Sequence, residues 1–270
     1  MNILFIGDIV GRVGRRMVKE YLNTFVEKYN VDFVIANGEN ATHGKGLSRN
    51  HYFELIDAGV DVITLGNHYL SKNEITRYID KVDCLVRPLN LLNDFGGEGS
   101  AIFDVNGIPV RVTNLLGSAF MTENVNSPYL SILDLLAECE EDCIHIVDFH
   151  AEATGEKYSF AYALDGKVTA VLGTHTHVQT NDARIFEGGT AFISDVGMTG
   201  FNDGVLGFLK ETVVPKIIYG QSGKMQTPDD GNGIFSAVIM SIDENTYKCK
   251  SIKTIKYIES EHENKNNEHP

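Results

Sequence analysis

Two histidines separated by a single residue point to metal chemistry, because neutral imidazole is the commonest protein ligand for transition metals. His175 and His177 lie just after the apolar run 168–172, which predicts a buried strand. Both side chains can therefore aim a ring nitrogen into the same space beyond the end of that strand. Such a pair indicates a metal site only when other residues of ligand type join it.

Four further apolar runs in the chain also end at polar residues of ligand type. The runs 2–7, 32–36, 60–66 and 143–149 predict strands that are buried on both faces, as in a sheet covered by helices. In an open α/β sheet, the carboxyl ends of the strands form the edge where ligands bind. We therefore expect eight side chains to meet at the same edge of the same sheet: Asp8, Glu39, Asn40, Asn67, His68, His150, His175 and His177.

This mixed set of carboxylates, amides and imidazoles is large enough for two metal ions. Two divalent ions held side by side can acidify a water that lies between them. The set suits manganese, iron or zinc better than calcium. His68 follows Asn67 but is not assigned as a ligand. Its ordinary pKa of about 6.5 suits it to general acid–base catalysis.

Each of these residues, taken alone, also has an ordinary structural interpretation. Asp8 is typical of a helix N-cap and Asn67 of a turn. Glu39 could be a solvated loop charge, and His150 a hydrogen-bonded core histidine. Their joint placement after separate strands favours the metal site. His145 falls inside a predicted strand, so we interpret it as a core histidine.

Composition sets the limits on the class of protein. The chain has 270 residues, of which 43% are hydrophobic, so it can bury a core. Its formal net charge of −14 argues against an electrostatic binder of nucleic acid polymers. Four cysteines without a C-x-x-C pair favour reduced thiols. Because the first residues enter a strand directly and no apolar run approaches ~20 residues, we expect a cytoplasmic protein without a membrane span.

The remaining patterns predict the architecture. Helical periodicity covers 13–29 and 48–58, a Ser71–Glu74 capping box indicates a third helix, and Ser127-Pro128 opens a fourth. The first two of these helices alternate with the first three strands, which predicts right-handed parallel crossovers. Turn signals later in the chain predict hairpins within 101–113, 183–194 and 235–258. We therefore expect an α/β fold with two mixed sheets packed face to face and helices outside.

One domain is expected over 1–258. The glycine-rich segment 196–233, with a helical piece near 206–219, is interpreted as a small cap that passes over the active edge. The charged tail 259–270 is predicted to be disordered.

The ligand-type residues occur in motifs whose order resembles that of calcineurin-like metallophosphoesterases: Asp8, then 38–40, 66–68, His150 and 173–177. More narrowly, 7–11, 37–41, 148–152, 173–179 and 195–200 resemble the bacterial YmdB family, and the resemblance covers nearly the whole chain up to about Ile258. It implies a four-layer α/β/β/α sandwich, a dinuclear centre and hydrolysis of 2′,3′-cyclic nucleotides such as 2′,3′-cAMP. It also implies a homo-oligomer and a role in bacterial regulation such as biofilm formation.

The resemblance further assigns roles to the candidate residues. It makes Glu39 a carboxylate that bridges two divalent or trivalent metal ions, with iron or manganese favoured and zinc as the alternative. Asp8 and His177, together with Asn40, would bind one ion. The other ion would be bound by Asn67, His150 and His175. A hydroxide that bridges the ions would attack phosphorus, with His68 as general acid or stabiliser of the phosphorane.

Two departures from the wider pattern affect the expected site. The superfamily usually has a histidine two residues after the first aspartate and an aspartate as the bridge, whereas this chain has Val10 and Glu39, as the narrower family does. Members of that family carry a tryptophan soon after the Gly-Asn-His motif. This chain has Tyr69-Leu70 there and no tryptophan anywhere, so the residues that contact substrate near His68 are left open.

Two other functions are kept as alternatives: a metal-dependent phosphomonoesterase and a non-catalytic regulator that senses nucleotides. A metallo-β-lactamase-like reaction would need His-x-His-x-Asp-His, whereas Val178-Gln179-Thr180 follows His177. A full ligand set with His68 to spare favours catalysis, because a structural site needs neither an open position nor a spare acid. The expected ligand is a small cyclic nucleotide, and neither a membrane nor a nucleic acid polymer is expected as a partner.

Overall fold

Two mixed β-sheets form the centre of the computed structural model, which describes residues 1–92, 96–139 and 142–261. Across the first sheet the strands are β2 (Asp8–Ile9), β12 (Met198–Phe201), β13 (Gly233–Ile242), β1 (Asn2–Ile6), β3 (Phe33–Asn37), β4 (Val62–Thr64) and β5 (Leu85–Val86), with β14 (Cys249–Ile258) paired to β13. Across the second they are β10 (Arg184–Ile185), β11 (Ala191–Ile193), β9 (Ala170–Thr174), β8 (Ile144–His150), β7 (Ile108–Leu116) and β6 (Ser100–Val105).

Each sheet combines a parallel part with antiparallel neighbours, as the sequence predicts. In the first sheet β1, β3, β4 and β5 run parallel, and β13 pairs antiparallel to β1. In the second, β7, β8, β9 and β11 are parallel. The three predicted hairpins are confirmed as β6–β7, β10–β11 and β13–β14. Parallel neighbours end at the same edge, so the strand ends of each sheet gather there.

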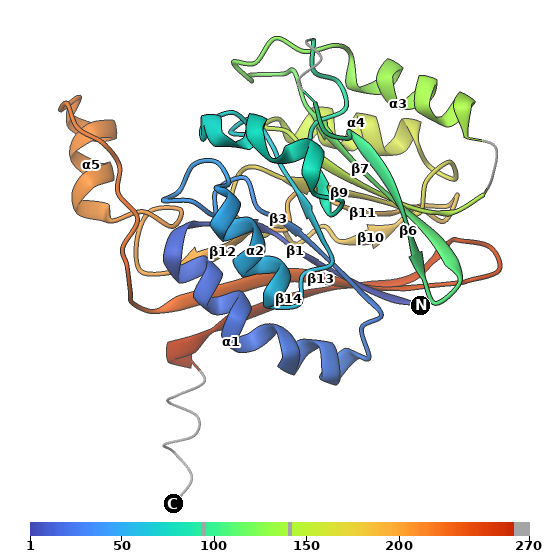
Figure 1. The fold of residues 1–270 in the computed structure, drawn as a ribbon, viewed down its shortest axis with the longest axis horizontal. Helices are drawn as coiled ribbons and strands as arrows, with labels where there is room; N and C mark the ends of the chain where they lie inside the picture. The colour runs from blue at the N-terminus through green and yellow to red at the C-terminus, as the bar shows by residue number, and fades with distance from the viewer. Residues whose placement is uncertain (93–95, 140–141, 262–270) are drawn as a thin grey trace, which may run out of the picture.

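Successive side chains of a strand point to opposite faces of the sheet, so each strand contributes to two layers of the core. On β1, Ile3 and Phe5 pack between the two sheets, whereas Leu4 and Ile6 face the helices outside. On β8, Ile144 and Ile146 face the first sheet, and the alternate residues pack under the helices of the other side. Figure 1 shows the sheets with α1 and α2 on one side and α3 and α4 on the other. The fold is therefore the expected α/β/β/α sandwich.

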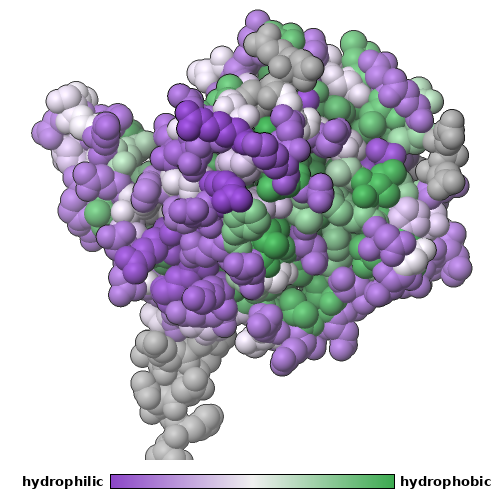
Figure 2. All heavy atoms as spheres, viewed as in Figure 1, coloured by the Kyte–Doolittle hydropathy of each residue, from purple (hydrophilic) through white to green (hydrophobic). Residues whose placement is uncertain are grey.

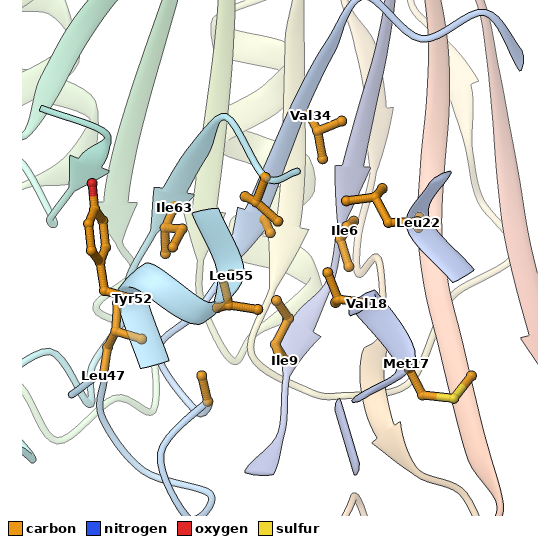
Figure 3. Packing of buried hydrophobic residues seen from close by; sticks show 14 of the residues in the cluster. Ile6, Ile9, Met17, Val18, Leu22, Val34, Leu47, Tyr52, Leu55 and Ile63 are labelled. Atoms are coloured by element: carbon orange, nitrogen blue, oxygen red, sulfur yellow. The ribbon is translucent and has the colours of Figure 1, made fainter. Parts of the chain in front are cut away.

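Two helices cover the first sheet. Helix α1 (Gly11–Tyr29) buries one face, and Figure 3 shows its Val18 and Leu22 near Ile6 of β1 in the cluster that also contains Met17 and Val34. Helix α2 (Arg49–Asp57) is capped by Ser48, whose side chain accepts a hydrogen bond from the backbone of the first turn. Hydrophilic residues cover most of their outer faces in Figure 2. Each helix thus has the single apolar stripe that its periodicity indicates.

The second sheet is covered by α3 (Pro128–Glu138) and α4 (Thr154–Ala163). Ser127 caps α3 as expected, because its hydroxyl accepts a hydrogen bond from the backbone N–H of Leu130. Helix α4 is not among the predicted helices. Its weak apolar stripe combines Phe160 and Ala161 with the buried Lys157, and a buried lysine breaks the periodicity on which such a prediction rests.

The prediction of a helix from the Ser71–Glu74 capping box is wrong. The chain instead forms the short 3-10 helices η1 (Asn73–Arg77) and η2 (Ile79–Lys81), and the residue that precedes η1 is Lys72. Glu74 accepts a hydrogen bond from the backbone N–H of Arg49 at 3.0 Å, so its carboxylate caps α2. Glu74 therefore makes a long-range contact with α2 and not the local capping contact that the sequence pattern predicts.

The segment interpreted as a cap begins inside the first sheet. Residues Met198–Phe201 form β12 between β2 and β13, and the chain leaves the sheet only after them. Helix α5 (Lys210–Tyr219) then projects from the body of the molecule, at the left of Figure 1. Of the tail 259–270, residues from 262 onward lie outside the described residues. Among the described helices, none combines the length and apolar character that crossing a bilayer requires.

Candidate metal centre

The ligand-type residues come from both sheets, so the expectation that they share one edge of one sheet is wrong. Asp8, Glu39 and Asn67 follow strands of the first sheet, whereas His150 and His175 come from β8 and β9 of the second. The two sheets pack face to face with their carboxyl edges at the same end. The strand ends that carry the site therefore face one another across the two sheets, and do not lie side by side along one sheet.

The first sheet supplies a buried group of carboxylates and an amide. Asp8, Glu39 and Asn40 are each at most 2% exposed. The Asn40 Nδ2 atom lies 3.0 Å from Glu39 Oε1, 3.1 Å from His177 Nε2 and 3.4 Å from Asp8 Oδ1. A half-turn of the amide exchanges its nitrogen for its oxygen, so Asn40 can also offer a carbonyl ligand at this point. His177 thus joins this group from the second sheet.

A second group forms around His150. Its Nε2 atom lies 3.2 Å from Glu39 Oε1, 3.1 Å from Asn67 Oδ1 and 3.0 Å from His175 Nδ1. Ligand atoms of Glu39, His150 and His175 all lie within 4.8 Å of one another. Gly66 makes room for this group, because a Cβ atom there would lie 2.2 Å from Glu39 Oε2 and 2.5 Å from His150 Nε2.

Each histidine has one ring nitrogen held by an oxygen outside the cluster. His150 Nδ1 lies 2.8 Å from the hydroxyl of Thr174, which itself donates to Asp148 and so accepts from the ring. His175 Nε2 lies 3.2 Å from a carboxylate oxygen of Glu152. His177 Nδ1 lies 3.2 Å from the carbonyl of Leu206. Each of these contacts favours a proton on the outer nitrogen, so the inner nitrogen faces the cluster and, once deprotonated, presents its lone pair there.

Other contacts fix the remaining donors. Glu123 accepts a hydrogen bond from Asn67 Nδ2 at 3.3 Å, which turns the Asn67 carbonyl oxygen toward His150. The backbone N–H of His68 donates to Glu39 Oε2 at 2.8 Å, and that of His175 donates to Asp8 Oδ2 at 3.1 Å. The carboxylates of Glu39 and Asp8 are therefore oriented by the backbone N–H groups of two other site residues, His68 and His175.

Asp148 joins the two sheets beneath the centre. Its buried carboxylate accepts hydrogen bonds from Asn37 at 2.9 Å, from Thr64 at 2.5 Å and from Thr174 at 2.7 Å. Asn37 and Thr64 belong to the first sheet, whereas Thr174 and Asp148 belong to the second. Burial raises the pKa of Asp148 to about 6, although its hydrogen bonds and His150 oppose that rise.

The turn that carries the two histidines is backbone-strained and held by a buried ion pair. His175 and His177 have φ values of 106° and 66°, a region that residues with side chains rarely adopt. Lys157 Nζ binds Thr174 O at 2.8 Å and Asp195 Oδ2 at 2.9 Å. The same oxygen of Asp195 accepts the backbone N–H of Thr176 at 2.9 Å. These contacts offset the conformational cost, which is about 1–3 kcal/mol per strained residue.

The electrostatics of the cluster favour positive charge at its centre. Burial by itself lowers the pKa of His150, but the charges of Glu39 and Asp8 outweigh it and raise that pKa to about 9. Burial would raise the pKa of Glu39, yet His150 and His68 hold it below its usual range. Burial and the neighbouring His150 lower the pKa of His175 to about 3. Without a metal ion, His150 therefore carries a proton that lies among ligand atoms of Glu39, Asn67 and His175.

The donor set fits a metal cation better than it fits that proton. An imidazole nitrogen shares one proton at most, yet His150 Nε2 faces three electronegative atoms at 3.0–3.2 Å. Ligands bound at ~2.0–2.1 Å around a tetrahedral ion lie about 3.3 Å apart, close to these separations. The inner lone pairs of the three histidines, with the carboxylates and amide oxygens, supply the mixed N/O shell that transition metals prefer.

All the predicted site residues meet in this cluster, with His68 at its edge. His68 is half-buried, and its pKa is lowered by burial against the opposing charge of Glu39. The residues that sequence reasoning missed are the supporting ones: Asp148, Glu123, Glu152, Lys157 and Asp195. Asp148, Glu152 and Asp195 stand inside or beside the quoted motifs, so proximity in sequence is a usable signal for them. Lys157 and Glu123 carry no such signal.

A two-sheet sandwich with this donor set at its strand ends defines a metal-dependent phosphoesterase of the calcineurin-like type. The chain belongs to the YmdB-like protein family, whose pattern matches residues 4–255. A relative from Bacillus subtilis (strain 168) is named 2′,3′-cyclic-nucleotide 2′-phosphodiesterase. It is 45% identical over 256 residues, which cover 94% of this chain and 96% of the relative.

Two crystal structures share the fold over nearly their whole length. One, described as a novel phosphatase from Mycoplasma pneumoniae, is 39% identical with a TM-score of 0.89, and the match covers 96% of this chain and 93% of that one. The other, a hypothetical protein from Thermus thermophilus, is 36% identical with a TM-score of 0.89, over 96% of this chain and 99% of that one.

Proposed function

We propose that this protein is a metal-dependent phosphodiesterase that hydrolyses 2′,3′-cyclic nucleotides. The observation that carries the proposal is the orientation of three histidines, each with its outer nitrogen bound to an oxygen and its inner nitrogen facing carboxylates and amides. The substrate class comes from the relative that is 45% identical and named for that reaction. Net charge is consistent with it, because bound metal cations would reverse the negative charge of the carboxylates at the strand ends in a chain whose overall charge is −14.

The two groups of donors would hold two ions, iron or manganese in the first place and zinc as the alternative. Asp8, Asn40 and His177 would hold one ion, whereas Asn67, His150 and His175 would hold the other. Glu39 Oε1 lies 3.0 Å from the amide of Asn40 and 3.2 Å from His150 Nε2, so it stands between the groups and would bridge them. When bound, two such ions supply Lewis acidity toward the phosphoryl oxygens and acidify a water.

Hydrolysis adds one water across one P–O bond of the cyclic diester and leaves a phosphomonoester and a free ribose hydroxyl. The ribose oxygen that leaves phosphorus requires a proton. His68 is the imidazole at the edge of the cluster, and it stands outside the proposed ligand set. A phosphate anion beside the ring favours the imidazolium form, so bound substrate opposes the effect of burial on the pKa of His68. His68 then delivers its proton to the leaving oxygen.

The proposal is tested by turnover of a substrate panel on metal-stripped protein that is resupplied separately with manganese, iron or zinc. The panel contains 2′,3′-cAMP, 3′,5′-cAMP and a phosphomonoester. We expect metal-dependent hydrolysis of 2′,3′-cAMP in preference to the other two. A His150→Ala variant, which removes the residue central to the second group, is expected to lose that turnover.

A phosphomonoesterase is the second candidate, because a crystal structure that shares the fold is described as a phosphatase. Hydrolysis of the monoester alone would select that function and reject ours. Binding of 2′,3′-cAMP without hydrolysis, under every metal, would indicate a nucleotide-sensing regulator instead.

A further inference from the structure

A pocket lined by several lysines adjoins the metal centre. It is a cavity of about 440 Å³ whose wall includes Lys45, Lys72, Lys216 and Lys224, together with Ser71 and Phe208. We call this cavity the lysine pocket. None of the described residues that line it is a carboxylate, although the chain as a whole has 37 acidic residues against 23 basic ones. The pocket therefore concentrates positive charge in a protein whose net charge is −14.

The ammonium groups of this pocket are mostly without protein partners. Lys216 donates to the carbonyl of Gly223 at 3.1 Å. Within the described part of the chain, the ammonium groups of Lys45, Lys72 and Lys224 form neither a hydrogen bond nor an ion pair. Lysines on protein surfaces are individually ordinary, but four that line one cavity raise the positive potential there, and an anion bound in the cavity would be attracted to it. The arrangement thus favours an anionic ligand.

The wall of the lysine pocket continues into the catalytic edge. The backbone N–H of Ser71 donates to the carbonyl of His68 at 2.9 Å, so Ser71 and Lys72 follow directly from the proposed general acid. Lys45 lies five residues after Asn40. On the opposite wall, Phe208 lies two residues after Leu206, whose carbonyl binds His177. A ligand held at the metal centre therefore has the lysine pocket beside it.

Close packing fixes the loop that separates the two sites. Gly44 and Gly46 both have positive φ, at 80° and 77°. A Cβ atom on Gly44 would lie 2.7 Å from the ring of Phe208, and one on Gly46 would lie 2.8 Å from the Cγ atom of Lys72. The loop therefore contacts Phe208 on one side and the 71–72 segment on the other. Both walls of the pocket are therefore in contact with this loop.

We propose that the lysine pocket binds a second phosphate of the nucleotide substrate, in addition to the cyclic phosphate at the metal centre. The proposal rests on the proposed function and adds that, within its substrate class, nucleotides with a second phosphate are preferred. Lysine ammonium groups bind phosphate as point charges, whatever group is attached to it. The second phosphate is either the 5′-phosphate of a mononucleotide or the neighbouring phosphodiester of a short oligonucleotide with a 2′,3′-cyclic end.

The kinetic test compares three substrates on the metal-loaded enzyme: adenosine 2′,3′-cyclic phosphate, its 5′-phosphorylated form, and a dinucleotide with a 2′,3′-cyclic end. We expect kcat/KM to be roughly tenfold or more higher for at least one of the substrates with a second phosphate, since a charge-assisted hydrogen bond contributes on that scale. Which of the two gains identifies the source of the phosphate. Equal values for all three substrates would overturn the proposal.

Variants then locate the effect. In Lys72→Ala/Lys224→Ala, the ratio of kcat/KM between the preferred phosphorylated substrate and the 5′-hydroxyl substrate is expected to fall toward one. Lys72→Arg/Lys224→Arg keeps the charge and is expected to keep most of the ratio. Lys253→Ala, on the exposed side of β14, serves as the matched control and keeps the wild-type ratio. An unchanged ratio in the double alanine variant would contradict the assignment of the pocket.

A second readout does not depend on turnover. Exposed lysines are acetylated in the metal-loaded protein with adenosine 3′,5′-bisphosphate, with adenosine 3′-monophosphate, or without ligand, and the sites are quantified by mass spectrometry. We expect the bisphosphate, and not the monophosphate, to protect Lys72 and Lys224 several-fold, with Lys253 unaffected. Failure of every cyclic nucleotide to react would refute the proposed function, yet this protection would still report on the pocket. Equal labelling under all conditions would refute the pocket itself.

Discussion

Lys157 and Asp195 form a buried ion pair beneath the metal centre, with 2.9 Å between Lys157 Nζ and Asp195 Oδ2 and both side chains 1% exposed. The pair holds the backbone on both sides of His175, since Lys157 binds the carbonyl of Thr174 and Asp195 binds the N–H of Thr176. Asp195 also accepts the N–H of Gly197 at 2.8 Å. A salt bridge in the interior thus sets the conformation of the turn that carries two proposed ligands.

Replacing Lys157 by methionine is expected to lower the free energy of unfolding by about 3–5 kcal/mol, because it leaves the carboxylate of Asp195 buried and unpaired. Urea unfolding measures this change. Lys19→Met, at an exposed position of α1, is the control and should change stability by less than about 0.5 kcal/mol. A Lys157→Met variant as stable as the control would show that the ion pair does not hold the turn.

Gly66→Ala is expected to empty the site of metal. The new Cβ atom would lie 2.2 Å from Glu39 Oε2 and 2.5 Å from His150 Nε2, so one of these side chains must move. Metal content after dialysis, measured by mass spectrometry, checks the result. Gly155→Ala, in the first turn of α4 with nothing near its Cβ position among the described residues, is the matched control and should retain metal. Wild-type metal content in Gly66→Ala would contradict the geometry of the cluster.

His68→Ala is expected to retain both ions and to lose activity. The side chain is outside the proposed ligand set, and general acid catalysis contributes roughly 10²–10⁴-fold to a rate. Metal content and kcat for 2′,3′-cAMP, measured on the same preparation, separate the two effects. Unchanged kcat would remove His68 from the mechanism, whereas loss of metal would make it a ligand.

His145 predicts a pH dependence of stability that is independent of the metal centre. Its ring is 3% exposed and 2.8 Å from the hydroxyl of Thr113, and burial lowers its pKa to about 3. In the unfolded chain His145 has an ordinary pKa of about 6.5, so between pH 6.5 and pH 3 it is protonated in the unfolded chain and neutral in the folded protein. The stability contributed by neutral His145 is present above pH 6.5 and is lost as the pH falls toward 3.

Between pH 7 and pH 5, this histidine alone should lower the free energy of unfolding by about 2 kcal/mol. The measurement is urea unfolding of the wild type and of His145→Gln at both pH values. The variant should lose about 2 kcal/mol less than the wild type over this interval. An equal loss in the two proteins would mean that His145 is not the group responsible.

Much of the architecture follows from local patterns. The apolar runs that end at Gly7, Gly66 and Gly173 are strands, because continuous apolar sequence suits a strand buried on both faces. The capping residues Ser48 and Ser127 begin helices for the same local reason. The set of strand-end polar residues could be predicted as well, since each stands directly after its strand.

The relation between the two sheets could not be predicted in this way. Asp8 and His175 meet across the sandwich through a hydrogen bond between residues 167 positions apart, which no local pattern encodes. The same holds for Glu74, which caps α2 instead of its own helix. Lys157 resembles a solvated helix charge in sequence, and only the fold places it against Asp195. The long-range contacts of these residues therefore could not be predicted from the local sequence patterns around them.

The central claim is that donors from two sheets converge on a pair of neighbouring cations. Its most direct test is anomalous diffraction from crystals of the manganese-loaded protein. We expect two anomalous peaks about 3.5–4 Å apart, one beside His150 and His175 and the other beside Asp8 and His177, with Glu39 between them. Crystals grown in excess manganese that show no peak within this cluster would contradict the account.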